Sequence, residues 1–459
     1  MNPSEHLVPA PAGATARPAG GLPFAFGRRF FLVFLVGLVW TGPAWWDLRY
    51  LWGMAAWDAL VLAAWLWDLG RLPRPQSLEV GRIWGSPVTL DVESRVTLEL
   101  RNRGAIRILA WLRDDVPVTL RGEAPLLALA APAGGTGRAH YTLRPAERGD
   151  AGFGEAYLRY TSPWQLAERW ARAALPQTVR VYPNLEEAKR STLYLVRSRQ
   201  TVIERRVKRL RGHGREFESL REYRQGDEVR DICWTATARR GKPITKIYEA
   251  ERSQTVWLVL DAGRLLRARS GGLSKLDYAA GAALTLAYVA LHSGDAVALV
   301  GYGRKVQQRV PPGRGPSQVR ALLEALAQVR AEPVEANHLL AAEALLSLQK
   351  QRSLVVWLTD LAETATTPEV VESAARLARR HLVLLAAIGQ PEMRQLLGRS
   401  PENVREMYRY AAAQQIIQRR DLLLRGLRQQ GALALEIEPA RLSTALVNQY
   451  LEAKERSLI

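Results

Sequence analysis

Cysteine is almost absent from this chain. Cys233 is the single cysteine among 459 residues, which excludes an intramolecular disulfide bond and every metal site built from several cysteines. Histidine is also scarce, and the six histidines show none of the short spacings that hold a metal ion. Acidic residues are outnumbered, with 45 Asp and Glu against 64 Lys and Arg, so the formal net charge is +19. This imbalance favours an anionic partner, which is a nucleic acid, an anionic membrane surface or an acidic protein surface.

The chain does contain enough apolar sequence to build several folded domains. Hydrophobic residues make up 47% of it and charged residues 24%, which excludes wholesale disorder. At roughly 100 to 200 residues per domain, the length predicts two to four domains. Composition alone names no function.

The N-terminal region has two apolar runs in succession. Residues 1–27 are rich in Pro, Ala and Gly and are predicted to form a mobile tail. Residues 28–70 then hold the two runs, and seven of the 14 tryptophans lie between Trp40 and Trp67. Indole rings favour the membrane interface, so this pattern predicts a hairpin of two transmembrane helices. A cleaved signal peptide followed by a buried helix is the alternative.

The charges around these runs predict a topology. Basic residues precede the first run and follow the second, whereas Asp47 and Arg49 in the connector cancel. The positive-inside rule then predicts a multi-pass protein of the inner (cytoplasmic) membrane, in contact with lipid, with the N-terminus and the later domains in the cytoplasm. Asp58 within the second run is expected to lie at shallow depth or to face the partner helix.

Residues 75–184 are rich in short alternating segments. Apolar and polar residues alternate in stretches such as 96–100 and 139–143, with turn residues between the stretches. This period of two predicts an antiparallel β-sandwich. We interpret the sandwich as a spacer, with a binding surface as the alternative.

Residues 185–255 form a densely charged segment of mixed sign. Its candidate partner-binding or structural residues are Glu216, Phe217, Arg221, Tyr223, Arg224, Gly226, Asp227, Arg230, Asp231, Trp234 and Arg239. The mixed signs argue against a simple nucleic-acid stripe. Arginine can bind carboxylates through two parallel hydrogen bonds, so the segment could form an ion-pair network that is anchored by buried aromatic rings such as Trp234. The alternatives are a recognition surface for another protein and, without an adjacent nucleophile to support it, a catalytic pair of carboxylates.

Residues 256–459 alternate between buried strands and helices. Apolar runs at 256–261, 295–301, 353–360, 381–389 and 433–437 predict strands, and the segments between them predict helices. This order predicts a doubly wound α/β sheet, which binds ligands at the carboxyl ends of its strands. Asp261 and Asp360 both end a predicted strand. The helix expected at 402–430 carries basic residues that indicate a solvated face or an acidic partner surface.

The charged segment also resembles a known family. The string EFESLREYRQGDEVRDICWTATARRGKPITKIYEAERSQ, running into WLVLDAGR, is similar to the signature of the domain-of-unknown-function-58 family. The resemblance covers roughly residues 150–390 and implies a von Willebrand factor type A-like domain after the motif. It also implies a functional association with MoxR-type AAA+ ATPases.

This resemblance raises the question of a metal site. Von Willebrand factor type A domains bind a divalent cation with an Asp-x-Ser-x-Ser loop, a threonine and a later aspartate. Here the loop begins at Asp261, and Gly263 and Leu265 replace both serines. Because Mg²⁺ prefers several oxygen ligands, Asp261, Gly263 and Asp360 predict a degenerate site without metal. The alternatives are a Mg²⁺ site and a structural role in which both aspartates cap helices or pair with Arg264.

These observations lead to one functional hypothesis and two alternatives. We expect a non-enzymatic, membrane-anchored scaffold or interaction protein that works with a MoxR-type AAA+ ATPase in the assembly or remodelling of complexes. It would need no cofactor, no small-molecule substrate and no specific nucleic acid. The first alternative is a metal-dependent adhesion module or metal-assisted enzyme that uses Asp261 and Asp360. The second, suggested by the charge of +19, is a nucleic-acid binder.

Overall fold

The computed structural model describes most of the chain. It covers residues 7–120, 125–184, 216–224, 229–249, 254–361 and 369–456. The chain divides into two compact units, Met1–Tyr182 and Pro183–Ile459. Each unit is described by itself.

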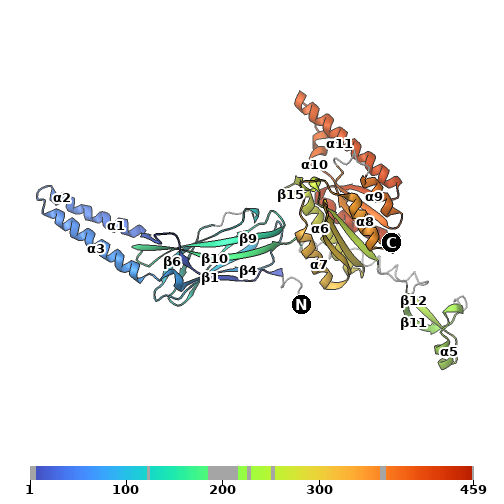
Figure 1. The fold of residues 1–459 in the computed structure, drawn as a ribbon, viewed down its shortest axis with the longest axis horizontal. Coiled ribbons are helices and arrows are strands. Elements are labelled where there is room, and N and C mark those ends of the chain that lie inside the picture. The colour runs from blue at the N-terminus through green and yellow to red at the C-terminus, as the bar shows by residue number, and fades with distance from the viewer. Residues whose placement is uncertain are drawn as a thin grey trace. The chain divides into compact units, whose positions relative to one another are not determined.

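The first unit consists of a helical hairpin and two β-sheets (Figure 1). Its helices are α1 (Arg28–Val36), α2 (Thr41–Ala44) and α3 (Tyr50–Arg71). Its strands are β1 (Ala12–Thr15), β2 (Arg17–Pro18), β3 (Phe24–Phe26), β4 (Leu78–Trp84), β5 (Ser94–Asn102), β6 (Ile108–Asp114), β7 (Leu127–Ala131), β8 (Thr136–Leu143), β9 (Gly149–Thr161) and β10 (Ala167–Val181). One sheet has the order β1-β4-β5-β8, the other has the order β2-β10-β9-β6-β7, and β3 also pairs with β10. Side chains along β4 and β5 alternate between buried and more exposed, as they do in a sheet with one face against a core.

The N-terminal residues differ from the predicted mobile tail. Strand β1 pairs with β4, and both β2 and β3 pair with β10. Ala16 between β1 and β2 is fully buried and donates its backbone N–H to Leu78 O at 2.8 Å. The composition misled the prediction because a strand can be added to a sheet edge through backbone hydrogen bonds, which do not need large apolar side chains.

The predicted transmembrane hairpin is wrong, and so is the predicted multi-pass location in the inner membrane. Within the described ranges, the structure contains no helix with the length and apolar character that crossing a membrane requires. The first apolar run is divided into α1 of nine residues, a 3₁₀ turn at Gly37–Trp40 and α2 of four residues. The second run forms α3 with 22 residues, but Asp58, Asp68 and four tryptophans lower its mean hydropathy.

Helices α1 and α3 instead pack against each other and against the second sheet. Trp57 in α3 donates its indole N–H to Val33 O in α1 at 3.0 Å. A Cβ atom at Gly37 would lie 2.9 Å from Asp58 Oδ1, so Asp58 faces the neighbouring helix segment. Asp68 near the end of α3 is buried and accepts the backbone N–H of Ala167 in β10 at 3.0 Å.

A buried ion pair links the two sheets of the first unit. Arg82 in β4 is fully buried, and its Nε lies 2.8 Å from Asp114 Oδ2 in β6. Tyr141 in β8 donates its hydroxyl to the same carboxylate oxygen at 2.6 Å. Burial and the charge of Asp114 raise the pKa of Tyr141, so the hydroxyl keeps its proton and remains a donor. The pair therefore joins strands from both sheets inside the core.

The second unit contains a six-stranded sheet with helices on both faces (Figure 1). Its strands are β13 (Thr255–Asp261), β16 (Ala296–Tyr302), β17 (Val306–Gly313), β18 (Leu354–Thr359), β19 (Leu382–Ile388) and β20 (Leu433–Ile437). Its helices are α6 (Lys275–His292), α7 (Gly315–Gln328), α8 (His338–Leu348), α9 (Glu369–Ala378), α10 (Pro391–Leu397), α11 (Val404–Gln429) and α12 (Leu442–Glu455). A short pair, β14 (Arg269–Ser270) and β15 (Leu273–Ser274), precedes α6. The sheet order is β17-β16-β13-β18-β19-β20, and only β17 runs antiparallel to its neighbour.

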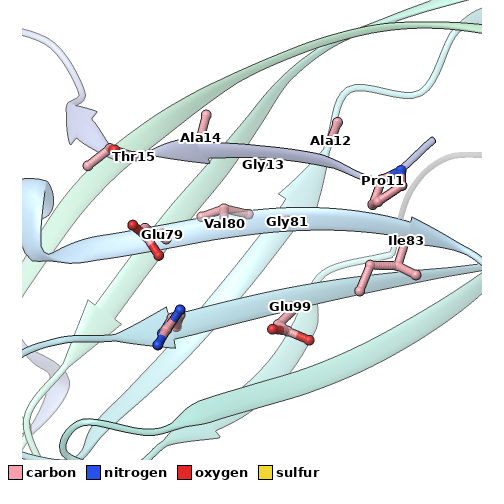
Figure 2. Close-up of a pocket in the computed structure, with 11 residues that line it drawn as sticks. Pro11, Ala12, Gly13, Ala14, Thr15, Glu79, Val80, Gly81, Ile83 and Glu99 are labelled. Atoms are coloured by element: carbon pink, nitrogen blue, oxygen red, sulfur yellow. The ribbon is translucent and has the colours of Figure 1, made fainter.

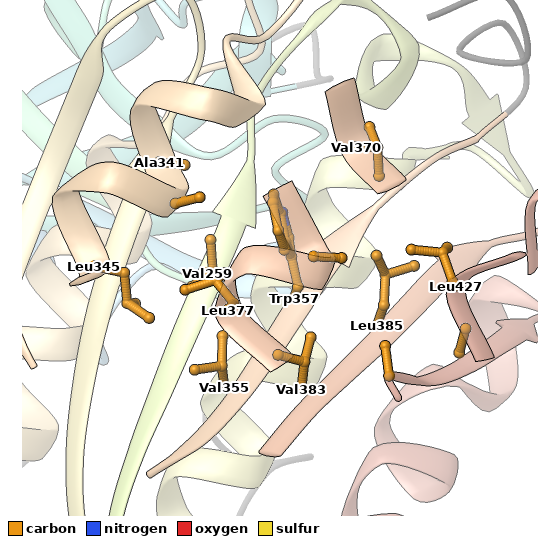
Figure 3. Close-up of a cluster of buried hydrophobic side chains, with 14 of the residues drawn as sticks. Val259, Ala341, Leu345, Val355, Trp357, Val370, Leu377, Val383, Leu385 and Leu427 are labelled. Atoms are coloured by element: carbon orange, nitrogen blue, oxygen red, sulfur yellow. The ribbon is translucent and has the colours of Figure 1, made fainter. Parts of the chain in front are cut away.

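One hydrophobic core cluster of this unit lies between the sheet and helices α8, α9 and α11. Figure 3 shows Val259, Val355 and Trp357 from the strands close to Leu345 of α8 and Leu377 of α9. Trp257 and Trp357 are the largest fully buried side chains of the unit. The central strands are buried on both faces, which explains their continuous apolar runs.

The charged segment contains a separate small hairpin. Strand β11 (Glu216–Glu222) pairs antiparallel with β12 (Ile244–Glu249), and α5 (Trp234–Arg240) lies between them in the chain. Gly241 follows α5 with a φ of 66°, a backbone conformation that glycine adopts at little cost and that commonly ends a helix.

We expect the Arg82→Met substitution to destabilise the first unit by about 3–5 kcal/mol, because it leaves the Asp114 carboxylate buried without its counter-charge. Urea unfolding of the full chain, followed by tryptophan fluorescence, measures this loss. The matched control is Arg144→Met, whose pair with Asp91 is largely exposed and should contribute only about 0–1 kcal/mol. Equal losses in the two variants would contradict the role given to the buried pair.

Candidate functional site at the carboxyl end of the sheet

The sheet order reverses at β13 and β18, where a doubly wound sheet usually binds its ligand. Asp261 is the last residue of β13, and Asp360 directly follows β18. The structure thus brings the two predicted aspartates to the same edge, and both are buried. Their partners decide what this edge can bind.

Both carboxylate oxygens of Asp261 are engaged within the chain. Oδ1 accepts the backbone N–H of Gly263 at 2.7 Å, and Oδ2 accepts the hydroxyl of Thr359 at 2.6 Å. Burial raises the pKa of Asp261, and these hydrogen bonds together with nearby His338 oppose the shift. Asp261 therefore holds its own loop and the end of the neighbouring strand.

Gly263 lies where a metal-binding loop would have its first serine. A Cβ atom at this position would be 2.8 Å from Ala336 N, so the close approach of that backbone leaves no room for a side chain. The adjacent Arg264 pairs with Glu335 at 2.9 Å in an exposed position. The loop is thus closed by backbone packing at the point where a serine ligand would be required.

Two cations hold the Asp360 carboxylate. Lys275 Nζ donates to Asp360 Oδ2 at 2.5 Å and to Ile388 O at 3.2 Å. Arg420 Nη2 donates to Asp360 Oδ1 at 2.9 Å. All three side chains are at most 2% exposed. A salt-bridged carboxylate, shared between α6 and α11, therefore occupies the place where a ligand would be expected.

The ion pairs continue from Arg420 to the far edge of the sheet. Arg420 Nη1 donates to Glu436 Oε1 in β20 at 2.6 Å, and Arg394 in α10 contacts the other oxygen of Glu436 at 2.8 Å. These arginines lower the pKa of Glu436, although burial opposes the shift. A Cβ atom at Gly389 would lie 2.9 Å from Glu436 Oε1, so glycine at the end of β19 makes room for this carboxylate.

A second buried polar group lies beside Asp261. The Trp357 indole N–H donates to the Tyr302 hydroxyl at 2.7 Å, and that hydroxyl lies 2.9 Å from His338 Nδ1. Because indole only donates, the Tyr302 proton points to Nδ1, and neutral His338 carries its own proton on Nε2. Burial raises the pKa of Tyr302 and lowers that of His338, so both stay neutral near pH 7.

The residues at this edge do not fit a divalent cation. In the ranges that the structure covers, no group of three or more His, Cys, Asp or Glu residues is arranged to hold a metal ion. Asp261 is used by its own loop, and Asp360 is used by Lys275 and Arg420. Mg²⁺ takes about six oxygen ligands, and two buried carboxylates that already accept other donors do not supply them.

The residues of the charged segment fall on the β11–β12 hairpin and on α5. Glu216, Phe217 and Arg221 belong to β11, Tyr223 and Arg224 follow it, Arg230 and Asp231 form a 3₁₀ turn, and Trp234 and Arg239 belong to α5. Gly226 and Asp227 lie outside the described residues. Trp234 is 67% exposed, so it is not the buried anchor that the ion-pair hypothesis required. An exposed ion pair joins Glu222 to Lys242 at 3.3 Å.

Sequence reasoning missed the cations that hold Asp360. Lys275 is separated from Asp360 by 85 residues, and Arg420 by 60. The position of Lys275 in the first turn of a helix is unfavourable, because its charge opposes the helix dipole, but this local pattern does not identify a partner.

A shallow pocket lies on the first unit. It measures about 370 Å³ and lies over strands β1, β4 and β5 (Figure 2). Gly13 and Gly81 have no side chains, which leaves a depression in the surface of the sheet. Glu79, Glu99 and Arg101 line its sides. Ion pairs with Arg103 and Arg138 engage the two glutamates, so the pocket offers no reactive group.

We expect the stability of the second unit to decrease as the pH falls below 6.5, the ordinary His338 pKa. Burial makes the pKa of His338 lower in the folded state than in the unfolded chain. Below pH 6.5 the unfolded chain therefore binds a proton that folded His338 does not bind, and the free energy of unfolding falls by up to about 1.4 kcal/mol per pH unit. His338→Asn keeps an acceptor for Tyr302 but cannot titrate, so this part of the pH dependence should disappear. Urea unfolding at a series of pH values measures it.

His381 does not confound that comparison, because it is present in the wild type and in the variant. The comparison reports His338 together with its effect on Asp261, because the charge of His338 acts on the pKa of Asp261. Burial lowers the pKa of His381, which acts in the same sense as His338. The raised pKa of Asp261 acts in the opposite sense, because the stability that protonated Asp261 contributes is lost as the pH rises through its folded-state pKa. A difference between the two proteins that is constant from about pH 7.5 to 5 would contradict the assignment.

Comparison with known proteins identifies a domain within the chain. Curated relatives include uncharacterized proteins of Mycobacterium bovis and Mycobacterium tuberculosis, each 26% identical over 182 residues, which are 39% of this chain and 56% of the relative. This chain thus spans little more than half the length of those relatives. The crystal structure of the conserved hypothetical protein BatB from Bacteroides thetaiotaomicron is 16% identical and covers 44% of this chain and 100% of its own, with a TM-score of 0.31. Residues 219–404 match the family described as Protein of unknown function DUF58, and the chain therefore carries a DUF58 domain.

Proposed function

We propose that this chain is a non-enzymatic interaction protein that works with a MoxR-type AAA+ ATPase in the assembly or remodelling of other complexes. The observation that carries the proposal is an exposed apolar stripe at the start of α11. The association with this class of ATPase comes from the resemblance of the charged segment to the DUF58 family, and so does a von Willebrand factor type A-like character of the α/β unit. The match to DUF58 over residues 219–404 supports that resemblance.

The stripe consists of Val404, Met407 and Tyr408. Residues three and four positions apart share one face of a helix, so the three side chains form a continuous surface. They are 73%, 56% and 75% exposed. Large exposed apolar side chains that lie together usually mark a site of contact with another molecule. Methionine and tyrosine are also enriched at protein interfaces.

The charge around the stripe indicates the kind of surface that it meets. Arg405 and Arg409 are exposed and lie four residues apart beside the stripe. The whole chain carries a net charge of +19. A partner surface with an apolar groove and acidic edges would complement both features. We therefore assign the contact with the ATPase to an acidic surface on that protein.

The rest of α11 holds the stripe in place. Arg420 is paired with Asp360 and Glu436, and Leu424 and Leu427 are buried in the core between α11 and the sheet. The first turns of α11 extend beyond the sheet and the other helices of the α/β fold (Figure 1). Asn403 caps the helix by accepting the backbone N–H of Glu406 at 2.9 Å. The stripe is therefore presented on a preformed and anchored helix.

Replacing both Met407 and Tyr408 by Asp should weaken binding of the purified MoxR-type ATPase at least about tenfold, because a few apolar side chains carry most of the energy of an interface. The thermal unfolding temperature should not change, since neither side chain is buried. Binding is measured by biolayer interferometry with ATP, with ADP and without nucleotide.

The control is Val118→Asp, which also replaces an exposed apolar side chain by Asp, at a position in the first unit that is 95% exposed. It should leave the affinity unchanged. If the double variant binds the ATPase with full affinity, the contact does not involve the stripe on α11. A wild-type chain that does not bind the ATPase in any nucleotide state would defeat the proposed function itself.

A further inference from the structure

The ammonium of Lys275 lies in a position that resembles that of a bound cation. It is 1% exposed, and its two hydrogen-bond acceptors are a carboxylate oxygen of Asp360 and the carbonyl oxygen of Ile388. Carboxylate and carbonyl oxygens are the ligands that hard divalent cations prefer in proteins. Asp360 follows β18 and Ile388 ends β19, so Nζ joins the ends of two adjacent parallel strands.

The location of Lys275 in its helix is unfavourable by itself. It is the first residue of α6, after the N-cap residue Ser274, whose side chain accepts the backbone N–H of Asp277. A positive charge at a helix N-terminus is repelled by the helix dipole, and a buried ammonium also loses its hydration. Both costs are offset mainly by Asp360, with smaller contributions from the Ile388 carbonyl and the charge of Glu392. Burial lowers the pKa of Lys275, and the charge of Asp360 opposes that shift.

The carboxylate has little left to offer to another cation. Arg420 takes Oδ1 and Lys275 takes Oδ2, so each oxygen accepts a charged donor. Lys275, Arg420 and Arg394 balance the carboxylates of Asp360 and Glu436, and Glu392 also acts on the charge of Lys275. A divalent cation placed at Asp360 would have to displace Lys275.

We propose that the Lys275 ammonium takes the place of a divalent cation at this edge of the sheet, so that the chain itself supplies the charge that neutralises Asp360. The edge is then complete without metal, and its stability does not respond to divalent ions. Removal of the ammonium leaves Asp360 and the Ile388 carbonyl without that charge, and a small cation from solution can then enter.

Thermal unfolding of the full chain tests this with three variants, each with MgCl₂, with EDTA, and with NaCl at matched ionic strength. Lys275→Ala vacates the ammonium position. Lys275→Gln is the milder change, because its amide can donate to Asp360 and can also offer an oxygen to a metal. The matched control is Lys454→Ala, which removes a lysine that pairs with the buried Asp295 at 2.8 Å in the same unit.

We expect the wild type to unfold at the same temperature in all three solutions. Each Lys275 variant should unfold roughly 6–20 °C lower than the wild type in EDTA, the range expected when a buried ion pair loses one partner. Mg²⁺ should return part of that loss in Lys275→Ala or, if that protein does not fold, in Lys275→Gln. Lys454→Ala should show no response to Mg²⁺ beyond that to NaCl.

Two results would overturn the proposal. A wild type that is stabilised by Mg²⁺ beyond the NaCl control would show that Asp360 is open to a metal in the presence of Lys275. Lys275 variants that respond to Mg²⁺ no more than Lys454→Ala would show that Lys275 forms an ordinary internal ion pair. Neither result depends on the ATPase, so this test is independent of the proposed function.

Discussion

The α/β unit depends most on the buried ion pairs that the Asp360 carboxylate forms with Lys275 and Arg420. An ionised carboxylate that is 1% exposed is stable only if nearby charges and hydrogen bonds replace its lost hydration. Satisfying it requires the start of α6, the middle of α11 and the ends of β18 and β19 to meet at one point. Through Arg420 and Glu436 the same requirement extends to β20 and α10. One buried carboxylate therefore joins these helices and strands at this edge.

The first unit uses a similar constraint. Arg82 and Asp114 form a buried pair between its two sheets. Tyr141 donates its hydroxyl to Asp114, and the Leu175 carbonyl accepts a hydrogen bond from Arg82. A pair of this kind contributes little net stability compared with apolar packing, but it is costly to break. It consequently disfavours any strand register that would separate the two side chains. Both units thus combine an apolar core with an internal charge network that joins distant elements of the fold.

Sequence reasoning succeeded where one local pattern determines the structure. The strands β13, β16, β18, β19 and β20 lie where continuous apolar runs predicted them, because central strands of a parallel sheet are buried on both faces. It failed for residues 28–70, where tryptophans and a lack of charge suggested a membrane although Gly37, Gly42 and Pro43 divide the first run into short helices. It also could not find Lys275 and Arg420 as partners of Asp360. Their separation along the chain is large, and pairing at a distance follows from tertiary packing that no local pattern records.

The closed edge and the exposed stripe on α11 are physically connected. Tyr408 and Arg420 are 12 residues apart on one continuous helix, a rise of about 18 Å. Because Arg420 is fixed by two carboxylates, the helix that carries Met407 and Tyr408 is held in one orientation before any partner arrives. A preformed helix loses little conformational entropy on binding, so more of its contact energy remains as affinity. The same charge network that fills the usual ligand position of the sheet therefore supports a surface suited to recognition.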